Sequence, residues 1–139
     1  MSAKNQMMLV DLFMTAFLIL SFIRWEGSGA FHFVVGTICL LAFALHIWLH
    51  RKWLKATTGA LLAGKLSPKL RAKYLVDALL LIVWVAAIVT GILAVVPFLD
   101  GVSPSPAGRL HGVSSRLAVP LLLIHIFQHR GQIRSYFKK

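Results

Sequence analysis

Four long apolar stretches separated by short polar segments dominate the chain of 139 residues. They cover about residues 7–25, 31–50, 75–98 and 110–129. Each approaches the roughly 20 residues that an α-helix needs to cross the hydrocarbon core of a bilayer. Backbone groups in lipid must be paired within their own segment, so helices are expected rather than strands. The pattern predicts an all-α fold, a transmembrane four-helix up-down bundle in which residues 1–139 form a single domain.

The composition agrees with lipid as the solvent for most of these residues. The chain is 58% hydrophobic, has a mean hydropathy of +0.79 and carries only four acidic residues. A soluble domain of this length could not bury so much apolar surface. The net charge of +11 would suit a nucleic-acid-binding protein, but the basic residues lie at the ends of apolar stretches, so no nucleic-acid partner is expected. The first stretch is long for a signal peptide and is expected to be a retained helix.

The distribution of basic residues predicts the direction of each helix. They are concentrated after the second and fourth stretches, at Arg51, Lys52, Lys55, Lys65, Lys69, Arg71 and Lys73, and at Arg130, Arg134, Lys138 and Lys139. By the positive-inside rule, both termini and the middle connection are cytoplasmic. We therefore expect a multi-pass protein of the bacterial inner (cytoplasmic) membrane. Its middle connection is expected to hold a short interfacial helix, broken near Ser67 and Pro68.

All six histidines fall in one pattern that occurs twice. Residues 46–51 read HIWLHR and residues 125–130 read HIFQHR, and a further histidine precedes each hexapeptide by 14 positions. The shared frame is H-x-V-x11-H-I-[WF]-x-H-R, and the second copy lies 79 positions after the first. Other positions in the frame differ freely, so the repetition indicates a chemical role for the histidines.

Helix geometry suggests what that role is. Two histidines 14 residues apart share a helix face, because the spacing is about 40° short of four turns, and lie about 21 Å apart. If the second and fourth helices run in parallel, His32 faces His111 near the outer surface, and His46 faces His125 near the inner surface. Each pair could hold the iron of a haem. Ionisable groups in lipid are costly, which weighs against four purely structural histidines.

The doubled H-x13-H pattern resembles that of the di-haem membrane cytochromes b. With LHIWLHRKW at residues 45–53, the four-helix arrangement is similar to a small bacterial family of cytochrome b-like membrane proteins, over nearly the whole chain. The resemblance implies that the axial ligands of two haem b groups are His32, His46, His111 and His125. The lone cysteine, Cys39, and the lack of a C-x-x-C-H motif mean that such haems would be bound non-covalently. Larger cytochromes b use glycines for close porphyrin approach, and this chain offers Gly36 and Gly91 but no central glycine in the first stretch.

Several polar residues lie close to the predicted haem sites. The candidates for contact with haem propionates are Arg116, Arg51, Arg130, His50 and His129. Arg116 stands out because it lies within the membrane, five residues after His111. Arg51 and Arg130 suit cytoplasmic anchors equally well. For His50 and His129, proton exchange or contact with lipid headgroups are the alternatives. Asp11 and Asp77 are interpreted as acids favoured by the helix dipole near helix starts, with proton relay to a quinone as the alternative.

The predicted function is transmembrane electron transfer. Iron held by two imidazoles has no open position for oxygen or a substrate, which suits single-electron transfer. The chain would be an electron-transfer protein, or the membrane subunit of an oxidoreductase, linking a quinone pool or an outer redox donor or acceptor to a partner protein. Membrane lipid surrounds it, a quinone is a candidate further cofactor, and no catalytic residue is predicted.

Two alternatives stay open. One is a quinone-linked oxidoreductase of a small oxidant such as superoxide. The other is a metal-ion transporter, because the H-x-x-x-H pairs place two imidazoles on one helix face, as a zinc or copper site requires. Its four ligands would be His46, His50, His125 and His129. That arrangement gives no role to His32 and His111.

Overall fold

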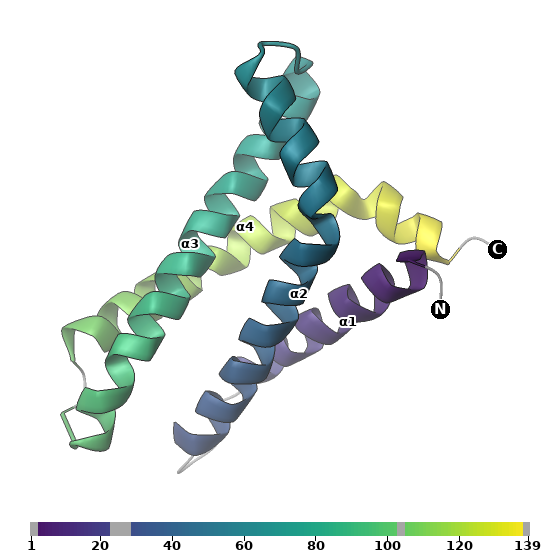
Figure 1. Cartoon of the computed structure of the whole chain (residues 1–139). Helices are drawn as coiled ribbons and strands as arrows, with labels where there is room; N and C mark the ends of the chain where they lie inside the picture. The colour runs from purple at the N-terminus through teal and green to yellow at the C-terminus, as the bar shows by residue number, and fades with distance from the viewer. Residues whose placement is uncertain (1–2, 23–28, 103–104, 138–139) are drawn as a thin grey trace. The chain divides into compact units, whose positions relative to one another are not determined.

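The computed structural model describes residues 3–22, 29–102 and 105–137, and all of its regular structure is helical. The four helices are α1 (Ala3–Ser21), α2 (Gly29–Leu62), α3 (Pro68–Leu99) and α4 (Pro106–Tyr136), as Figure 1 shows. The prediction of an all-α chain with four helices is confirmed. Residues 23–25, at the end of the first predicted span, lie outside the described residues.

Three of the helices are long and apolar enough to cross a membrane. These are α2, α3 and α4, with 34, 32 and 31 residues. They expose large apolar side chains such as Leu41 (65%), Ile82 (64%) and Leu123 (63%), which is the surface that lipid requires. These three helices therefore suggest that the chain is a membrane protein. The remaining helix, α1, is shorter at 19 residues and carries polar side chains in its first half.

The connection between α2 and α3 differs from the sequence-based prediction. No separate interfacial helix is present, because α2 continues without a break to Leu62 and α3 begins at Pro68. The break itself lies where it was predicted. Ser67 caps α3 by accepting a hydrogen bond from the backbone N–H of Leu70, and Pro68 occupies the first turn, where its missing N–H costs nothing. Gly64 makes the turn with a φ of 68°, a left-handed conformation that glycine adopts readily.

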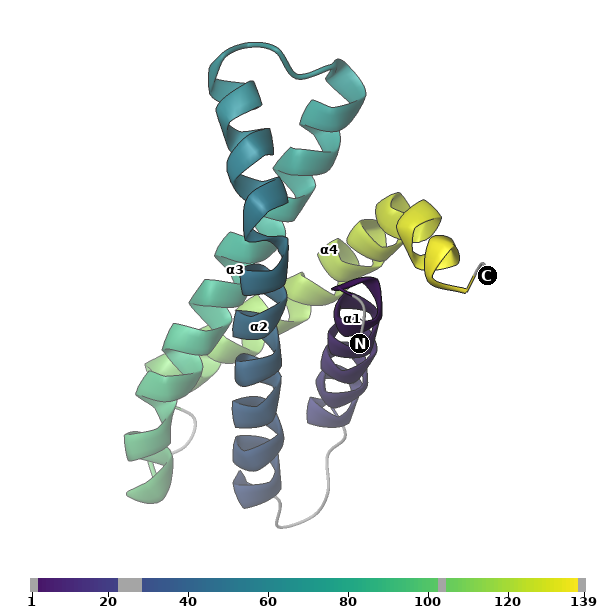
Figure 2. The same ribbon diagram turned by 45° about the vertical axis from the view of Figure 1, so that its right-hand side comes forward.

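The chain divides into two compact units, which we call the first and second hairpin. The first hairpin consists of Met1–Leu62 and Gln132–Lys139. In it, α1 lies antiparallel along the first part of α2, and α2 continues beyond the start of α1 (Figures 1 and 2). Val35, Cys39 and Ala42 are buried on α2 at spacings of four and three, which places them on a single helix face.

The second hairpin consists of Ala63–Gly131 and pairs α3 with α4. Contacts at both ends show that the two helices are antiparallel. Near the start of α3, Lys73 Nζ donates to the backbone carbonyl of Gln128 at 2.8 Å, and near its end a Cβ on Gly108 would lie 4.0 Å from the Ala94 side chain. The buried Ser105 begins α4 by accepting a hydrogen bond from the backbone N–H of Gly108 at 3.1 Å.

Candidate histidine and carboxylate sites

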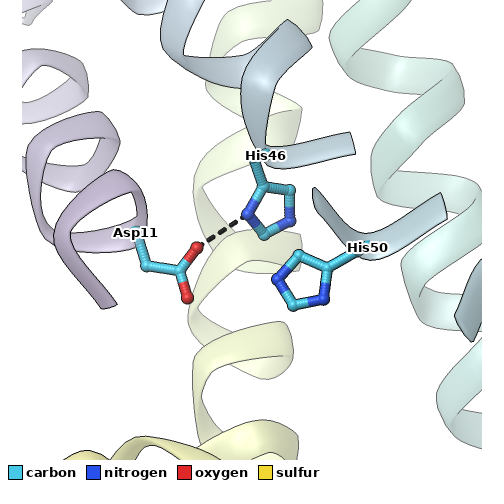
Figure 3. Close-up of side chains that lie close together, drawn as sticks. All are labelled: Asp11, His46 and His50. Atoms are coloured by element: carbon cyan, nitrogen blue, oxygen red, sulfur yellow. Dashed lines mark hydrogen bonds and ion pairs between the residues drawn. The ribbon is translucent and has the colours of Figure 1, made fainter. Parts of the chain in front are cut away.

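The first hairpin brings one aspartate and two histidines together, and we call these the first cluster (Figure 3). Asp11 is on α1, whereas His46 and His50 lie one turn apart on the same face of α2. His46 Nδ1 and Asp11 Oδ1 are 2.7 Å apart, and the two imidazole centroids are 4.6 Å apart. One potential ligand atom from each of the three residues lies within 4.8 Å of the others.

The second hairpin repeats this arrangement in what we call the second cluster, formed by Asp77 of α3 and by His125 and His129 of α4. His125 Nδ1 lies 2.7 Å from Asp77 Oδ1, and His129 Nε2 lies 3.1 Å from Asp77 Oδ2. The two imidazole centroids are again 4.6 Å apart. The His129 side chain is 17% exposed, so most of this side chain is covered by the packed helices.

The other two histidines of the frame bond to backbone carbonyls instead of carboxylates. His32 Nδ1 lies 3.0 Å from the carbonyl oxygen of Ser21, in the last turn of α1, where helix carbonyls have no partner of their own. His111 Nδ1 lies 2.8 Å from the carbonyl oxygen of Ala87 on α3. Gly91 allows this approach, because a Cβ there would lie only 3.0 Å from His111 Nδ1. Gly91, which the resemblance to cytochromes b connects with the porphyrin, contacts the predicted ligand itself.

These four contacts fix the tautomer of each imidazole. A carbonyl oxygen and an ionised carboxylate can only accept a hydrogen bond, so Nδ1 carries the proton and donates it. In the neutral imidazole, Nε2 then carries the lone pair that a metal ion requires. The four histidines that share this state are His32, His46, His111 and His125. His129 differs, because the nitrogen that it directs at the carboxylate is Nε2.

The acceptors themselves are repeated along the chain. Asp77 lies 66 positions after Asp11, and Ala87 lies 66 positions after Ser21. The chain is thus a tandem pair of equivalent helical hairpins, in which the 79-residue repeat of α2 and α4 is matched by a 66-residue repeat of α1 and α3. The sequence interpretation missed the role of Asp11 and Asp77. The sequence did contain a signal for this role, because Asp11 and Asp77 each interrupt an apolar stretch and lie 66 positions apart.

The arginines of the repeated frame fold back onto their own helix. Arg51 donates to the carbonyl of Trp48 at 2.6 Å, and its guanidinium lies 4.0 Å from the centroid of the exposed Trp48 ring. Arg130 repeats this, with a 2.8 Å bond to the carbonyl of Phe127 and 4.1 Å to the ring. These cation–π contacts explain why the frame has an aromatic residue three positions before each arginine. Arg116 is exposed on α4.

The structure therefore places each predicted axial ligand beside an acceptor in its own hairpin. It adds the two aspartates to the candidate site and gives His129 a carboxylate partner. The pairing of His32 with His111 and of His46 with His125, the two haems and the propionate contacts stay predictions. No protein-family model, curated protein or solved structure matches the chain.

Proposed function

We propose that the chain is an electron-transfer protein of the bacterial inner membrane that holds two haem b groups, one between His32 and His111 and one between His46 and His125. One observation carries the proposal. Each of the four histidines donates Nδ1–H to an acceptor on the helix that precedes it, in the same way in both hairpins. Histidines that ligate metals characteristically hold their second nitrogen in this manner.

The residues present fit haem better than they fit a purely structural role. A satisfied core histidine can use either nitrogen, whereas here the same nitrogen, Nδ1, makes the bond in all four histidines. The hydrogen bonds also distinguish the two members of the H-x-x-x-H pair in the second hairpin. His125 keeps Nε2 for a metal, but His129 directs Nε2 at Asp77. This supports His125 over His129 as the ligand.

A bound haem with two imidazole ligands would supply one-electron oxidation and reduction without an open coordination position. The protein would fix the imidazole planes through their Nδ1 bonds and surround the site with apolar helices that exclude water. In this proposal α1 is a fourth span, both termini are cytoplasmic, and a quinone or a partner protein exchanges electrons at each face. The chain then acts alone as a shuttle or as the membrane subunit of an oxidoreductase.

A second candidate function has a specific observation in its favour. Each cluster contains two histidines and a carboxylate whose ligand atoms lie within 4.8 Å of one another, a set that suits a divalent transition metal. Two such sites in a membrane protein would fit a metal-ion transporter. This candidate explains Asp11 and Asp77, but it gives no account of the ordered Nδ1 bonds of His32 and His111.

Spectroscopy of the purified protein separates the two functions. We expect reduced b-type absorption bands and two haems per chain in a pyridine haemochrome assay. His125→Ala should lose one haem, whereas the matched control His129→Ala should retain both, because Asp77 still holds His125. A protein expressed with adequate haem supply that binds zinc or another divalent ion in place of haem would support the transporter instead.

A further inference from the structure

The four Nδ1 bonds are of two chemical kinds, and each hairpin contains one of each. The predicted inner ligands, His46 and His125, donate to carboxylates at 2.7 Å in both cases. The predicted outer ligands donate to neutral backbone carbonyls, at 3.0 Å for His32 and 2.8 Å for His111. The same difference occurs at equivalent positions in both hairpins. Both predicted inner ligands therefore bond to carboxylates, and both predicted outer ligands bond to carbonyls.

An anionic acceptor changes the ligand more than a neutral one does. A hydrogen bond to a carboxylate is charge-assisted and about twice as strong as one to a carbonyl, so it draws the Nδ1 proton away from the ring. The imidazole then donates more electron density through Nε2. The negative charge of the carboxylate acts in the same sense, and the low dielectric of a membrane interior strengthens both effects. In a bound haem, both would favour ferric over ferrous iron and so lower the reduction potential.

Further groups hold the two carboxylates in place. Asp77 Oδ2 lies 3.1 Å from His129 Nε2, so both oxygens of this carboxylate bond to histidines of α4. Asp11 Oδ2 accepts a longer bond of 3.4 Å from the hydroxyl of Tyr136. The Asp77 side chain is 13% exposed and that of Asp11 is 31% exposed, so both are partly buried. These contacts give His129 and Tyr136 a role in orienting the acceptor, not in binding iron.

We propose that Asp11 and Asp77 are positioning residues that set the inner haem at a lower reduction potential than the outer haem. The inference rests on the proposed binding of two haems. It adds a direction to that function, because a lower inner potential favours electron donation from the cytoplasmic side toward an acceptor at the outer face. A reductant in the cytoplasm and an oxidant outside it are then the classes of redox partner that the chain serves.

The test is a redox titration of the haem-loaded protein, followed by its visible bands. The wild-type protein should show two midpoints. In Asp11→Asn and Asp77→Asn, which keep the shape and an acceptor oxygen but lose the charge, the lower midpoint should rise and the upper should stay. We expect at least a tenfold change in the ratio of oxidised to reduced inner haem at fixed potential, about 59 mV for a one-electron couple. Asp100→Asn removes an equal charge at the exposed end of α3 and should shift neither midpoint.

A second measurement covers the case in which an asparagine variant loses haem. The double variant His32→Ala, His111→Ala should retain the inner haem alone, and its midpoint should be the lower of the two wild-type values. If the retained haem has the higher value, or if both asparagine variants leave two unchanged midpoints, the inference is overturned while the proposed function stands. If the wild-type protein binds no haem, the proposed function itself is wrong and the inference goes with it.

Discussion

At the scale of single residues, the four predicted ligands use the same nitrogen but differ in the acceptor that it bonds, and His129 differs in the nitrogen itself. The neighbouring helix determines which acceptor a histidine reaches. His111, for example, reaches the carbonyl of Ala87 because Gly91 has no side chain. A methyl group at Gly91 would lie 3.0 Å from Nδ1 and 3.1 Å from Cε1 of that ring, tighter than nearly all packed Cβ contacts, so the ring would have to shift. The absence of a Cβ at Gly91 thus allows the observed orientation of His111, a candidate ligand.

Gly91→Ala is expected to displace the His111 ring and to weaken the outer haem site. Overpacking of this kind typically costs about 1–3 kcal/mol, which exceeds the roughly 0.5–1 kcal/mol gained by replacing a helical glycine with alanine. Thermal unfolding and the haem-to-protein ratio measure the effect. Gly36→Ala is the matched control, because nothing lies within 4 Å of the new methyl group, and it should be neutral or stabilising. Equal behaviour of the two variants would contradict the packing described for Gly91.

At the scale of helices, apolar length predicted the existence and type of all four elements, because the hydropathy of a membrane helix depends on its own residues alone. The prediction for the middle connection was wrong because basic residues that mark a membrane boundary do not end a helix. The helices α2 and α3 extend through these residues, and the local stop signal lies at Ser67 and Pro68. The roles of Asp11 and Asp77 depend on the antiparallel register of two helices, which composition does not encode.

Whether α1 crosses the membrane decides the topology. Four spans place both termini on one side, whereas three place them on opposite sides. We expect green fluorescent protein to fluoresce when fused to either end, and alkaline phosphatase to be inactive at both. The Arg and Lys residues around the α2–α3 connection and near the end of α4 favour the cytoplasmic side, and α1 as a fourth span would return the N-terminus to that side. Phosphatase activity at the N-terminus alone would show that α1 does not span.

At the scale of the whole molecule, the chain is one helical hairpin used twice. Of the four predicted axial ligands, each hairpin holds one that is bonded to a carboxylate and one that is bonded to a backbone carbonyl. In the proposed function, the repetition lets each hairpin supply one imidazole to each haem. The sequence pattern alone predicted this equivalence for α2 and α4, and the bonded acceptors extend it to α1 and α3.

The central claim is that histidines pair between the hairpins at equal depth, and haem counting in two double variants tests it most directly. The variant His46→Ala, His125→Ala removes both ligands of one proposed site, so it should keep one haem per chain. The variant His32→Ala, His46→Ala removes one ligand from each site and should keep none. Two haems retained by the first variant, or one retained by the second, would contradict this pairing.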